Sequence, residues 1–364
     1  MEDALKLTVY AGERDRAGGR LLSDALMDLY ESHEVRASIL MRGLEGFGIR
    51  HRLQTERLLT LSEDLPILAV ALDAPSRIQS LMAEVRALTR HGLITLERAE
   101  LLGEHDREPV PARSTGELKL TVHVGRQERA DGRRAHLAVV DCLDRHGMAG
   151  ASVLLGVDGT AHGRRYRARF MASNSEVPVM IVSVGASAAI ANALPELHSI
   201  LARPMMTLER VQVCKRDGVL LGAPTTVPSP DEAGMARWQK LTVYASERSR
   251  HGHEPLHGAL IRRLRAEGAE GAAGATALRG LWGYHGEHRP HGERFWSLAR
   301  HVPVLGVLLD TQANMARWFE IVDELTQQTG LVTSEIVPAL RAAGPEVVHG
   351  GLELAARHGD ARNI

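Results

Sequence analysis

The sequence has few aromatic residues, two cysteines and no long apolar run. Phe, Trp and Tyr make up 4% of the 364 residues, so the cores must be built mainly from aliphatic side chains. Cys142 and Cys214 form neither a CxxC motif nor a disulfide framework, which is typical of a reducing compartment. No window approaches 18 consecutive apolar residues, and the acidic N-terminus lacks the apolar segment of a secretory signal. We therefore expect a cytoplasmic protein without membrane insertion.

Charge and catalytic motifs are also sparse. The formal net charge is −1, which gives no overall attraction to nucleic acid or to anionic membranes. The chain contains neither the GxGxxG fingerprint, nor a phosphate-binding P-loop, nor HExxH, nor a Ser-His-Asp signature. Neither a basic helix nor a platform of aromatic residues for base stacking accompanies its arginines. These absences predict a protein that is not an enzyme, has no cofactor and does not bind nucleic acid.

Three copies of one unit fill most of the chain. The strand-like sequence KLTV begins at Lys6, at Lys119 and at Lys240. Three further landmarks follow each copy in the same order: a glycine-containing turn, a strand that begins at Pro66, Pro178 or Pro303, and a last strand. Such recurrence is the signature of an internal repeat. It predicts unit 1 at residues 1–103, unit 2 at 117–215 and unit 3 at 238–340, with linkers at 104–116 and 216–237 and a flexible tail at 341–364.

Each unit has the pattern of a β-α-β-β-α-β fold. In unit 1, Leu5, Leu7 and Val9 alternate on one face of a strand, and apolar stripes at helical spacing follow at residues 21–29 and 78–88. Gly92 is expected to end the second helix. This order predicts the α+β class, with three ferredoxin-like units.

One sheet face of each ferredoxin-like unit would be left uncovered by its own helices. Three sheets that face inward as an intrachain pseudo-trimer would bury it. A dimer of chains and three separate beads remain the alternatives.

The quoted residues resemble a known family. KLTVY, the turn RGLEGFG that starts at Arg42, the segment LSEDLPI and the strand GLITLE are similar to the PII-like family called domain of unknown function 190. The resemblance covers most of each unit and implies ferredoxin-like subunits in a compact trimer, with small-molecule sites between subunits and a loop that reaches a protein partner. The family usually supplies one unit per chain, so three fused units are a departure. Unit 2 departs further, because Leu155 replaces the arginine of the turn.

The turns and the loops after them carry the candidate ligand-binding residues. Arginines there would attract phosphate or carboxylate groups, and the glycines allow close backbone approach to a ligand. The residues selected are Arg42, Gly43, Gly46, Arg50 and Arg52 in unit 1, Gly156, Gly159, Arg164 and Arg165 in unit 2, and Arg279, Gly280 and Gly283 in unit 3. Alternatively, the glycines make a turn out of an edge strand and the arginines are solvated, or the loop contacts only a protein partner.

Two other patterns have less specific interpretations. Unit 3 is rich in histidine, and HGEHRPH at residues 285–291 offers three imidazoles in a loop, so metal binding is an alternative to solvated histidines. Glu97, Glu209 and Glu335 recur at one position of the last strand. We expect these carboxylates to point out of the sheet or to pair with neighbours such as Arg98 and Arg210.

The sequence therefore favours a non-enzymatic PII-like signalling protein that binds an anionic small molecule, such as a nucleotide, between units and presents loops to a protein partner. A structural or protein-interaction module without a ligand is the main alternative, and metal binding through unit 3 is another.

Overall fold

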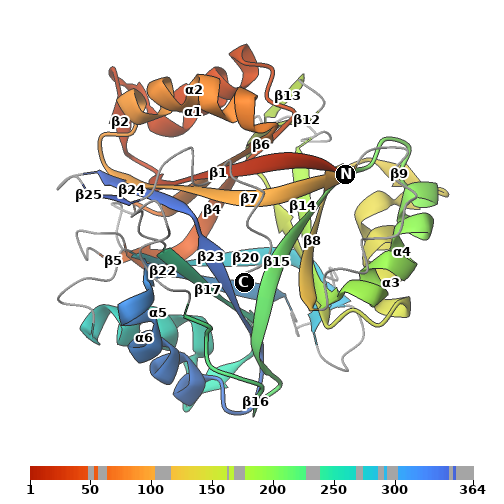
Figure 1. Cartoon of the computed structure of the whole chain (residues 1–364), viewed down its shortest axis with the longest axis vertical. Helices are drawn as coiled ribbons and strands as arrows, with labels where there is room; N and C mark the ends of the chain where they lie inside the picture. Colours follow the sequence, from red (N-terminus) through yellow and green to blue (C-terminus); the bar gives the residue numbers. More distant parts are fainter. Residues whose placement is uncertain are drawn as a thin grey trace.

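The structure is a computed structural model, and it describes residues 1–47, 53–55, 64–102, 116–161, 164–167, 177–226, 238–267, 274–285, 291–292, 302–343 and 347–349. Within these residues the fold is mixed α and β, with one large antiparallel sheet and six helices. Figure 1 shows these helices packed in pairs at the periphery, with the strands gathered between them.

The same six elements occur in the same order in every unit. Unit 1 has β1 (Glu2–Gly12), α1 (Leu22–Ser32), β4 (Ala37–Phe47), β6 (Pro66–Asp73), α2 (Pro75–Leu88) and β7 (Gly92–Leu102). Unit 2 has β8 (Glu117–Gly125), α3 (Ala135–Arg145), β11 (Gly150–Leu155), β14 (Pro178–Ala186), α4 (Ser187–Ile200) and β15 (Met205–Arg216). Unit 3 has β17 (Trp238–Ser246), α5 (Leu256–Glu267), β20 (Gly274–His285), β22 (Pro303–Thr311), α6 (Gln312–Leu325) and β23 (Leu331–Val337).

Shorter strands extend this plan. They are β2 (Arg16–Ala17), β3 (Arg20–Leu21), β5 (Leu53–Thr55), β9 (Arg129–Ala130), β10 (Arg133–Arg134), β12 (Asp158–Ala161), β13 (Arg164–Arg167), β16 (Val219–Leu220), β18 (Arg250–His251), β19 (Glu254–Pro255), β21 (His291–Gly292), β24 (Ala339–Ala343) and β25 (Val347–His349). The segment expected to be a flexible tail thus begins inside a strand, because β24 pairs with β7 and β25 pairs with β24.

Within a unit, the first strand lies in the middle of its sheet. In unit 1, β1 pairs with β7 on one side and with β6 on the other, and β6 pairs with β4. The corresponding strands of unit 2 and unit 3 pair in the same order, and all of these pairings are antiparallel.

Strand pairing also joins every unit to both others. The second strands meet where β4 pairs with β20, β20 pairs with β11, and β12 pairs with β4; we call these three contacts the joints. The last strands make a second set of contacts, in which β15 pairs with both β7 and β23, and β24 pairs with β7. Each set closes on itself, so the sheet is continuous around all three units.

Side chains on the first strand alternate between two buried surroundings. Leu5, Leu7 and Val9 are fully buried against the helices of unit 1, which confirms the predicted apolar face. Each unit has such an outer core. A further core draws its residues from all three units, including Met41, Leu154 and Leu278. The second face of each sheet is therefore buried against the other two units.

Helix boundaries follow ordinary local rules. Pro75 occupies the first turn of α2, where its missing N–H is no loss. The expectation that Gly92 ends the second helix was wrong: α2 ends at Leu88 with Thr89 as its C-cap, and Gly92 begins β7 with a positive φ of 118°. A side chain there would meet the carbonyl oxygen of Tyr10, because its Cβ would lie 2.3 Å away.

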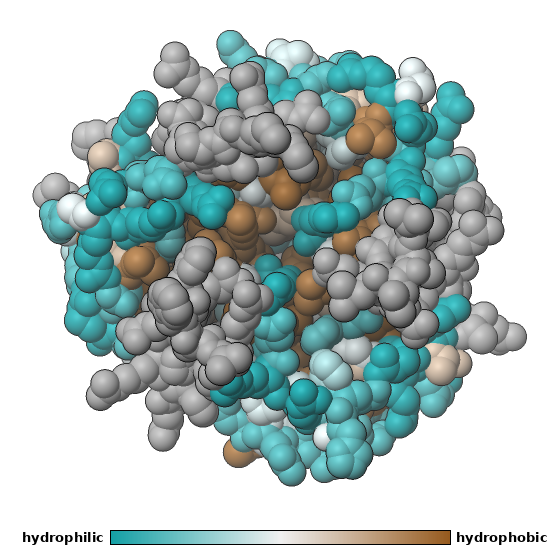
Figure 2. All heavy atoms as spheres, turned by 180° about the vertical axis from the view of Figure 1, so that it is seen from behind, coloured by the Kyte–Doolittle hydropathy of each residue, from teal (hydrophilic) through white to brown (hydrophobic). Residues whose placement is uncertain are grey.

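The surface of the molecule carries both hydrophobic and hydrophilic residues (Figure 2). Among the described residues, no helix has the length and apolar character that crossing a membrane requires. Figure 2 shows hydrophobic residues in the recessed middle of the rear face, with hydrophilic residues over much of its rim.

Candidate functional site

Six charged side chains meet where the three sheets face one another. They are the lysines of the three KLTV strands and the glutamates of the three last strands: Lys6, Lys119, Lys240, Glu97, Glu209 and Glu335. Strand register brings them together, because Lys6 lies opposite Glu97 on neighbouring strands, as do Lys119 and Glu209, and Lys240 and Glu335. We call these six residues the charged ring.

Charges alternate around the ring, so every group has two partners of opposite sign. Inside each unit, the distance from the lysine Nζ to the glutamate Oε2 is 3.1 Å. Between units the ion pairs are closer still: Lys6 with Glu209, Lys119 with Glu335, and Lys240 with Glu97. Each glutamate thus links the lysine of its own unit to the lysine of another, and the ring has no net charge.

Burial and ion pairing oppose each other in setting the pKa values of the ring. Burial disfavours every charge, but Lys240 and Lys6 hold the pKa of Glu97 well below its usual value. Burial is likewise outweighed at Lys240, whose pKa is raised by Glu335 and Glu97. Burial prevails at Lys119, whose pKa lies below its usual value despite Glu209 and Glu335.

The expected positions of the recurring glutamates were wrong. These carboxylates point neither into solvent nor toward Arg98 or Arg210; they are at most 5% exposed and pair with lysines. A metal ion among the three carboxylates is also disfavoured, although their oxygens lie within 4.8 Å of one another. Three ammonium groups already contact the same oxygens, and a further cation would be repelled.

A cavity of about 90 Å³ adjoins the ring. Repeated positions of the first strand line it in layers: the lysines, then Thr8, Thr121 and Thr242, then Tyr10, His123 and Tyr244. Most of its remaining lining is apolar, with Val70, Val182 and Val307 among it.

The tyrosine layer contains one substitution. His123 stands where the other units have Tyr10 and Tyr244, and burial lowers the pKa of its imidazole to about 4. The histidine is therefore neutral at pH 7, and its protonation would add a positive charge beside Lys6 and Glu209.

The six selected glycines lie at the joints, where two units approach closely. A Cβ on Gly159 would lie 2.2 Å from the carbonyl oxygen of Ser38, and one on Gly283 would lie 2.1 Å from that of Ala151. Gly46 and Gly280 face the backbone of another unit in the same way, and Gly43 and Gly156 face its backbone or side chains. These glycines admit a neighbouring strand, which neither the turn nor the ligand interpretation had anticipated. Their role in binding a ligand stays a prediction.

The selected turn arginines lie where a strand passes from one joint to the next. Arg42 donates to Glu13 (Nη2–Oε2 2.8 Å), and Arg279 donates to Glu247 (Nη2–Oε2 3.1 Å). At the corresponding positions unit 2 has Arg126 in place of the glutamate and Leu155 in place of the arginine. Two units therefore share an ion pair beside their joints that unit 2 lacks.

Arg165 has a different environment from the other loop arginines. It reaches from unit 2 to unit 1, where it pairs with Asp28 and Glu31 on α1, and it also donates to Asp158 (Nη2–Oδ2 2.7 Å). These three carboxylates and its 12% side-chain exposure make it a link between units. Arg164 lies beside it in β13, whereas Arg50 and Arg52 lie outside the described residues.

The unit 3 histidines contribute no metal cluster in the part of the chain that the structure describes. His257 contacts Glu45 of unit 1 (Nε2–Oε1 3.6 Å), and burial lowers the pKa of its imidazole. Residues 286–290 of the HGEHRPH segment lie outside the described residues, so that hypothesis stays a prediction.

Comparison with known families identifies the three units. The model of DUF190, described as "Uncharacterized ACR", matches residues 4–101, 117–213 and 238–339. The chain belongs to the DUF190 family. The match confirms three tandem copies of this PII-like family, as the sequence had predicted.

Similarity to solved structures is weak. An aspartate kinase from Synechocystis is 11% identical over 97% of this chain, with a TM-score of 0.25. The chain spans 47% of that kinase. An unknown protein from Galdieria sulphuraria is 14% identical over 57% of this chain and 98% of its own length, with a TM-score of 0.17. These values carry no argument about function.

The lysines of the charged ring are the residues that sequence reasoning missed. Each DUF190 unit repeats a lysine on its first strand and a glutamate on its last, and these strands are neighbours in a β-α-β-β-α-β sheet. Opposite charges at facing positions in all three copies were therefore the available signal.

Proposed function

We propose that the chain is a non-enzymatic PII-like regulatory protein, built as an intrachain pseudo-trimer of three ferredoxin-like units, that binds an anionic small molecule beside its joints. The observation that carries this proposal is the arginine–glutamate pair of units 1 and 3, exposed in unit 1 and half-buried in unit 3, which unit 2 replaces at both positions.

The architecture is supported by the two closed sets of strand pairings. The first strand of each unit lies between the third and the last, which is the order of a ferredoxin-like sheet. Small-angle X-ray scattering of the chain tests the arrangement: a compact profile is expected, and the profile of an extended chain would contradict the pseudo-trimer.

Anion binding is supported by the accessibility of the turn arginines. The Arg42 side chain is 48% exposed and that of Glu13 is 36% exposed. Exposed ion pairs contribute at most about 1 kcal/mol, so a phosphate or carboxylate that makes two hydrogen bonds can replace the glutamate. Because Leu155 cannot do this, the position in unit 2 should not bind the anion.

The proposal also includes a protein partner and a cytoplasmic location. The loops that would present themselves to a protein partner fall largely on residues 48–63, 168–176 and 286–301, which lie mostly outside the described residues. The two free, buried cysteines suit a cytoplasmic protein. No nucleic-acid or membrane partner belongs to this proposal.

Isothermal titration calorimetry with a panel of adenine nucleotides and second messengers tests the binding site. Arg42→Ala and Arg279→Ala are each expected to weaken binding about 10- to 100-fold, the effect of losing hydrogen bonds to a charged group. Glu13→Gln should strengthen it, because the variant releases Arg42. Arg133→Ala, which removes an exposed pair with Asp141 on unit 2, serves as the control. If neither Arg42→Ala nor Arg279→Ala changes the affinity, other residues bind the anion.

A structural or protein-interaction module is the second candidate, and the glycine packing favours it. The joints hold strands so closely that a single Cβ would meet another unit. Mass spectrometry of molecules that copurify with the chain separates the candidates. A bound anion supports the regulatory proposal, whereas a chain that carries no ligand and binds none of the panel supports the module.

A further inference from the structure

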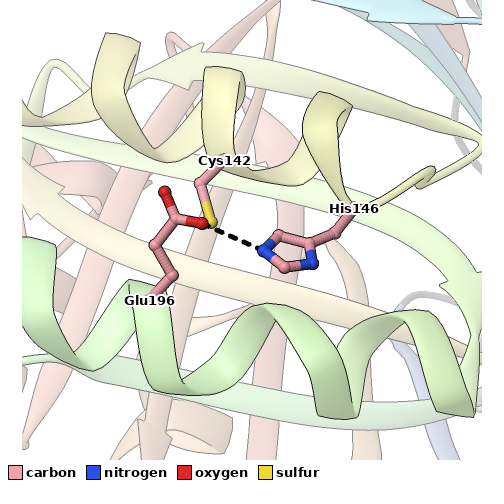
Figure 3. A group of neighbouring side chains, drawn as sticks. All are labelled: Cys142, His146 and Glu196. Atoms are coloured by element: carbon pink, nitrogen blue, oxygen red, sulfur yellow. Dashed lines mark hydrogen bonds and ion pairs between the residues drawn. The ribbon is translucent and has the colours of Figure 1, made fainter.

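Three potential metal ligands meet between the helices of unit 2. Cys142 lies in the last turn of α3 and His146 caps the C-terminus of that helix one turn later, so their side chains share a face, and Glu196 approaches them from α4. Figure 3 shows all three side chains directed into the space between the helices, with the Glu196 carboxylate beside the thiol and joined to the imidazole. This cluster is separate from the charged ring and from the joints.

The donor atoms are close to the spacing of a metal site. One sulfur, one nitrogen and one carboxylate oxygen lie within 4.8 Å of one another, and His146 Nε2 is 3.0 Å from Glu196 Oε2. Zinc bonds of about 2.0–2.3 Å at tetrahedral angles place such donors roughly 3.3–3.6 Å apart. Small side-chain rotations would therefore bring the three donors onto one ion.

Burial gives the cluster a closed side and an open side. Cys142 is fully buried, and its thiol hydrogen-bonds the carbonyl of Ala193 (Sγ–O 4.0 Å). The His146 and Glu196 side chains are 25% and 35% exposed, so they face the solvent. An ion held here would enter from the His146 side and keep one position for water.

We propose that Cys142, His146 and Glu196 form a zinc site with three protein ligands and a fourth position open to water. Thiolate, imidazole and carboxylate are the donors that zinc accepts in proteins, and a thiolate excludes harder ions such as Mg²⁺ and Ca²⁺. On binding, the thiol proton passes to solvent as the Zn–S bond forms. Arg145, which pairs with Glu196 in the metal-free protein, then turns to solvent.

Unit 1 provides an internal comparison. His33 and Glu84 occupy the equivalent positions on α1 and α2, with Nε2 2.9 Å from Oε1, but Leu29 stands where unit 2 has Cys142. The imidazole–carboxylate pair is thus common to both units, and the thiol is the donor that unit 1 lacks. Unit 1 should not hold the ion.

Cobalt(II) titration of the full-length chain tests the site, because thiolate-bound cobalt absorbs in the near ultraviolet. The wild-type chain should give a thiolate-to-cobalt band that saturates at one equivalent and disappears when Zn²⁺ is added. Cys142→Ala should abolish the band, whereas Cys214→Ala should leave it unchanged. Since these are the two cysteines of the chain, the band can be assigned. Histidines of unit 3 would bind cobalt without this band.

Leu29→Cys supplies the matched gain of function. It gives unit 1 the missing thiol beside His33 and Glu84, so the band amplitude should double. Circular dichroism checks that each variant folds. The absence of a band in the wild-type chain, or its persistence in Cys142→Ala, would overturn the proposal, and a Leu29→Cys band of wild-type amplitude would overturn the three-donor geometry.

Discussion

Glu209→Gln isolates the contribution of the charged ring to stability. Glu209 pairs with Lys6 of unit 1 and Lys119 of unit 2, and its side chain is 3% exposed. Neutralising it leaves a buried ring with one excess positive charge. Removing one partner of a buried ion pair typically costs about 3–5 kcal/mol, because the remaining charge has lost its compensation. For units of about 300 residues in total, this corresponds to a fall in melting temperature of roughly 5–8 °C if all three unfold together.

Urea denaturation followed by circular dichroism measures this loss. Asp141→Asn is the matched control, since it removes one carboxylate from the exposed pair with Arg133 and should cost less than about 1 kcal/mol. A double variant, Glu209→Leu with Lys119→Met, removes one charge of each sign. Its cost should fall short of the sum of the two single variants by about 2 kcal/mol or more. Equal costs for Glu209→Gln and Asp141→Asn, or additive costs in the cycle, would refute the reasoning.

Further predictions concern pH, the joints and the ring. Because the pKa of His123 is lowered to about 4 in the folded chain, the histidine stabilises the fold fully above its unfolded pKa of about 6.5, and this contribution is lost as pH falls toward 4. Between pH 7 and pH 4.5 this loss amounts to about 2 kcal/mol. His123→Tyr introduces the residue of the other two units and should abolish the loss in urea titrations at these two pH values; equal acid sensitivity in the variant would contradict this. Gly159→Ala should destabilise the chain by about 2 kcal/mol or more, because its Cβ would meet Ser38, whereas Gly116→Ala, which meets nothing within 4 Å, should be nearly neutral in thermal melts. The pKa of Glu97 is lowered in the folded chain, so the ionised carboxylate stabilises the fold above its unfolded pKa of about 4.3, and this stabilisation is lost on further acidification. Glu97→Gln should therefore flatten the plot of unfolding free energy against pH below pH 4.5. An unchanged plot would show that the ring is not charged.

Sequence patterns were informative wherever a single unit determines the outcome. The alternation of Leu5, Leu7 and Val9 predicted the face that packs on the helices. This feature depends on contacts inside one copy. Three repeats of one strand sequence likewise indicated three units, which the family match confirms.

Features formed between units were harder to predict. The sequence predicts a solvent-facing Glu97 because the other face of an isolated sheet is exposed, whereas the neighbouring units bury it against Lys6 and Lys240. The sequence likewise places Gly159 and Gly283 in a ligand-binding turn, but the strand that requires their small size comes from another unit. The cavity has walls from all three units, so no single copy contains its pattern.

The joints also bear on how the molecule responds to dilution. Subunits of an ordinary trimer separate at low protein concentration, whereas here the partners are tethered through residues 103–115 and 227–237. Tethering keeps each unit at an effective concentration near millimolar beside the others, whatever the amount of protein present. The unfolding midpoint should therefore be the same at nanomolar and micromolar chain.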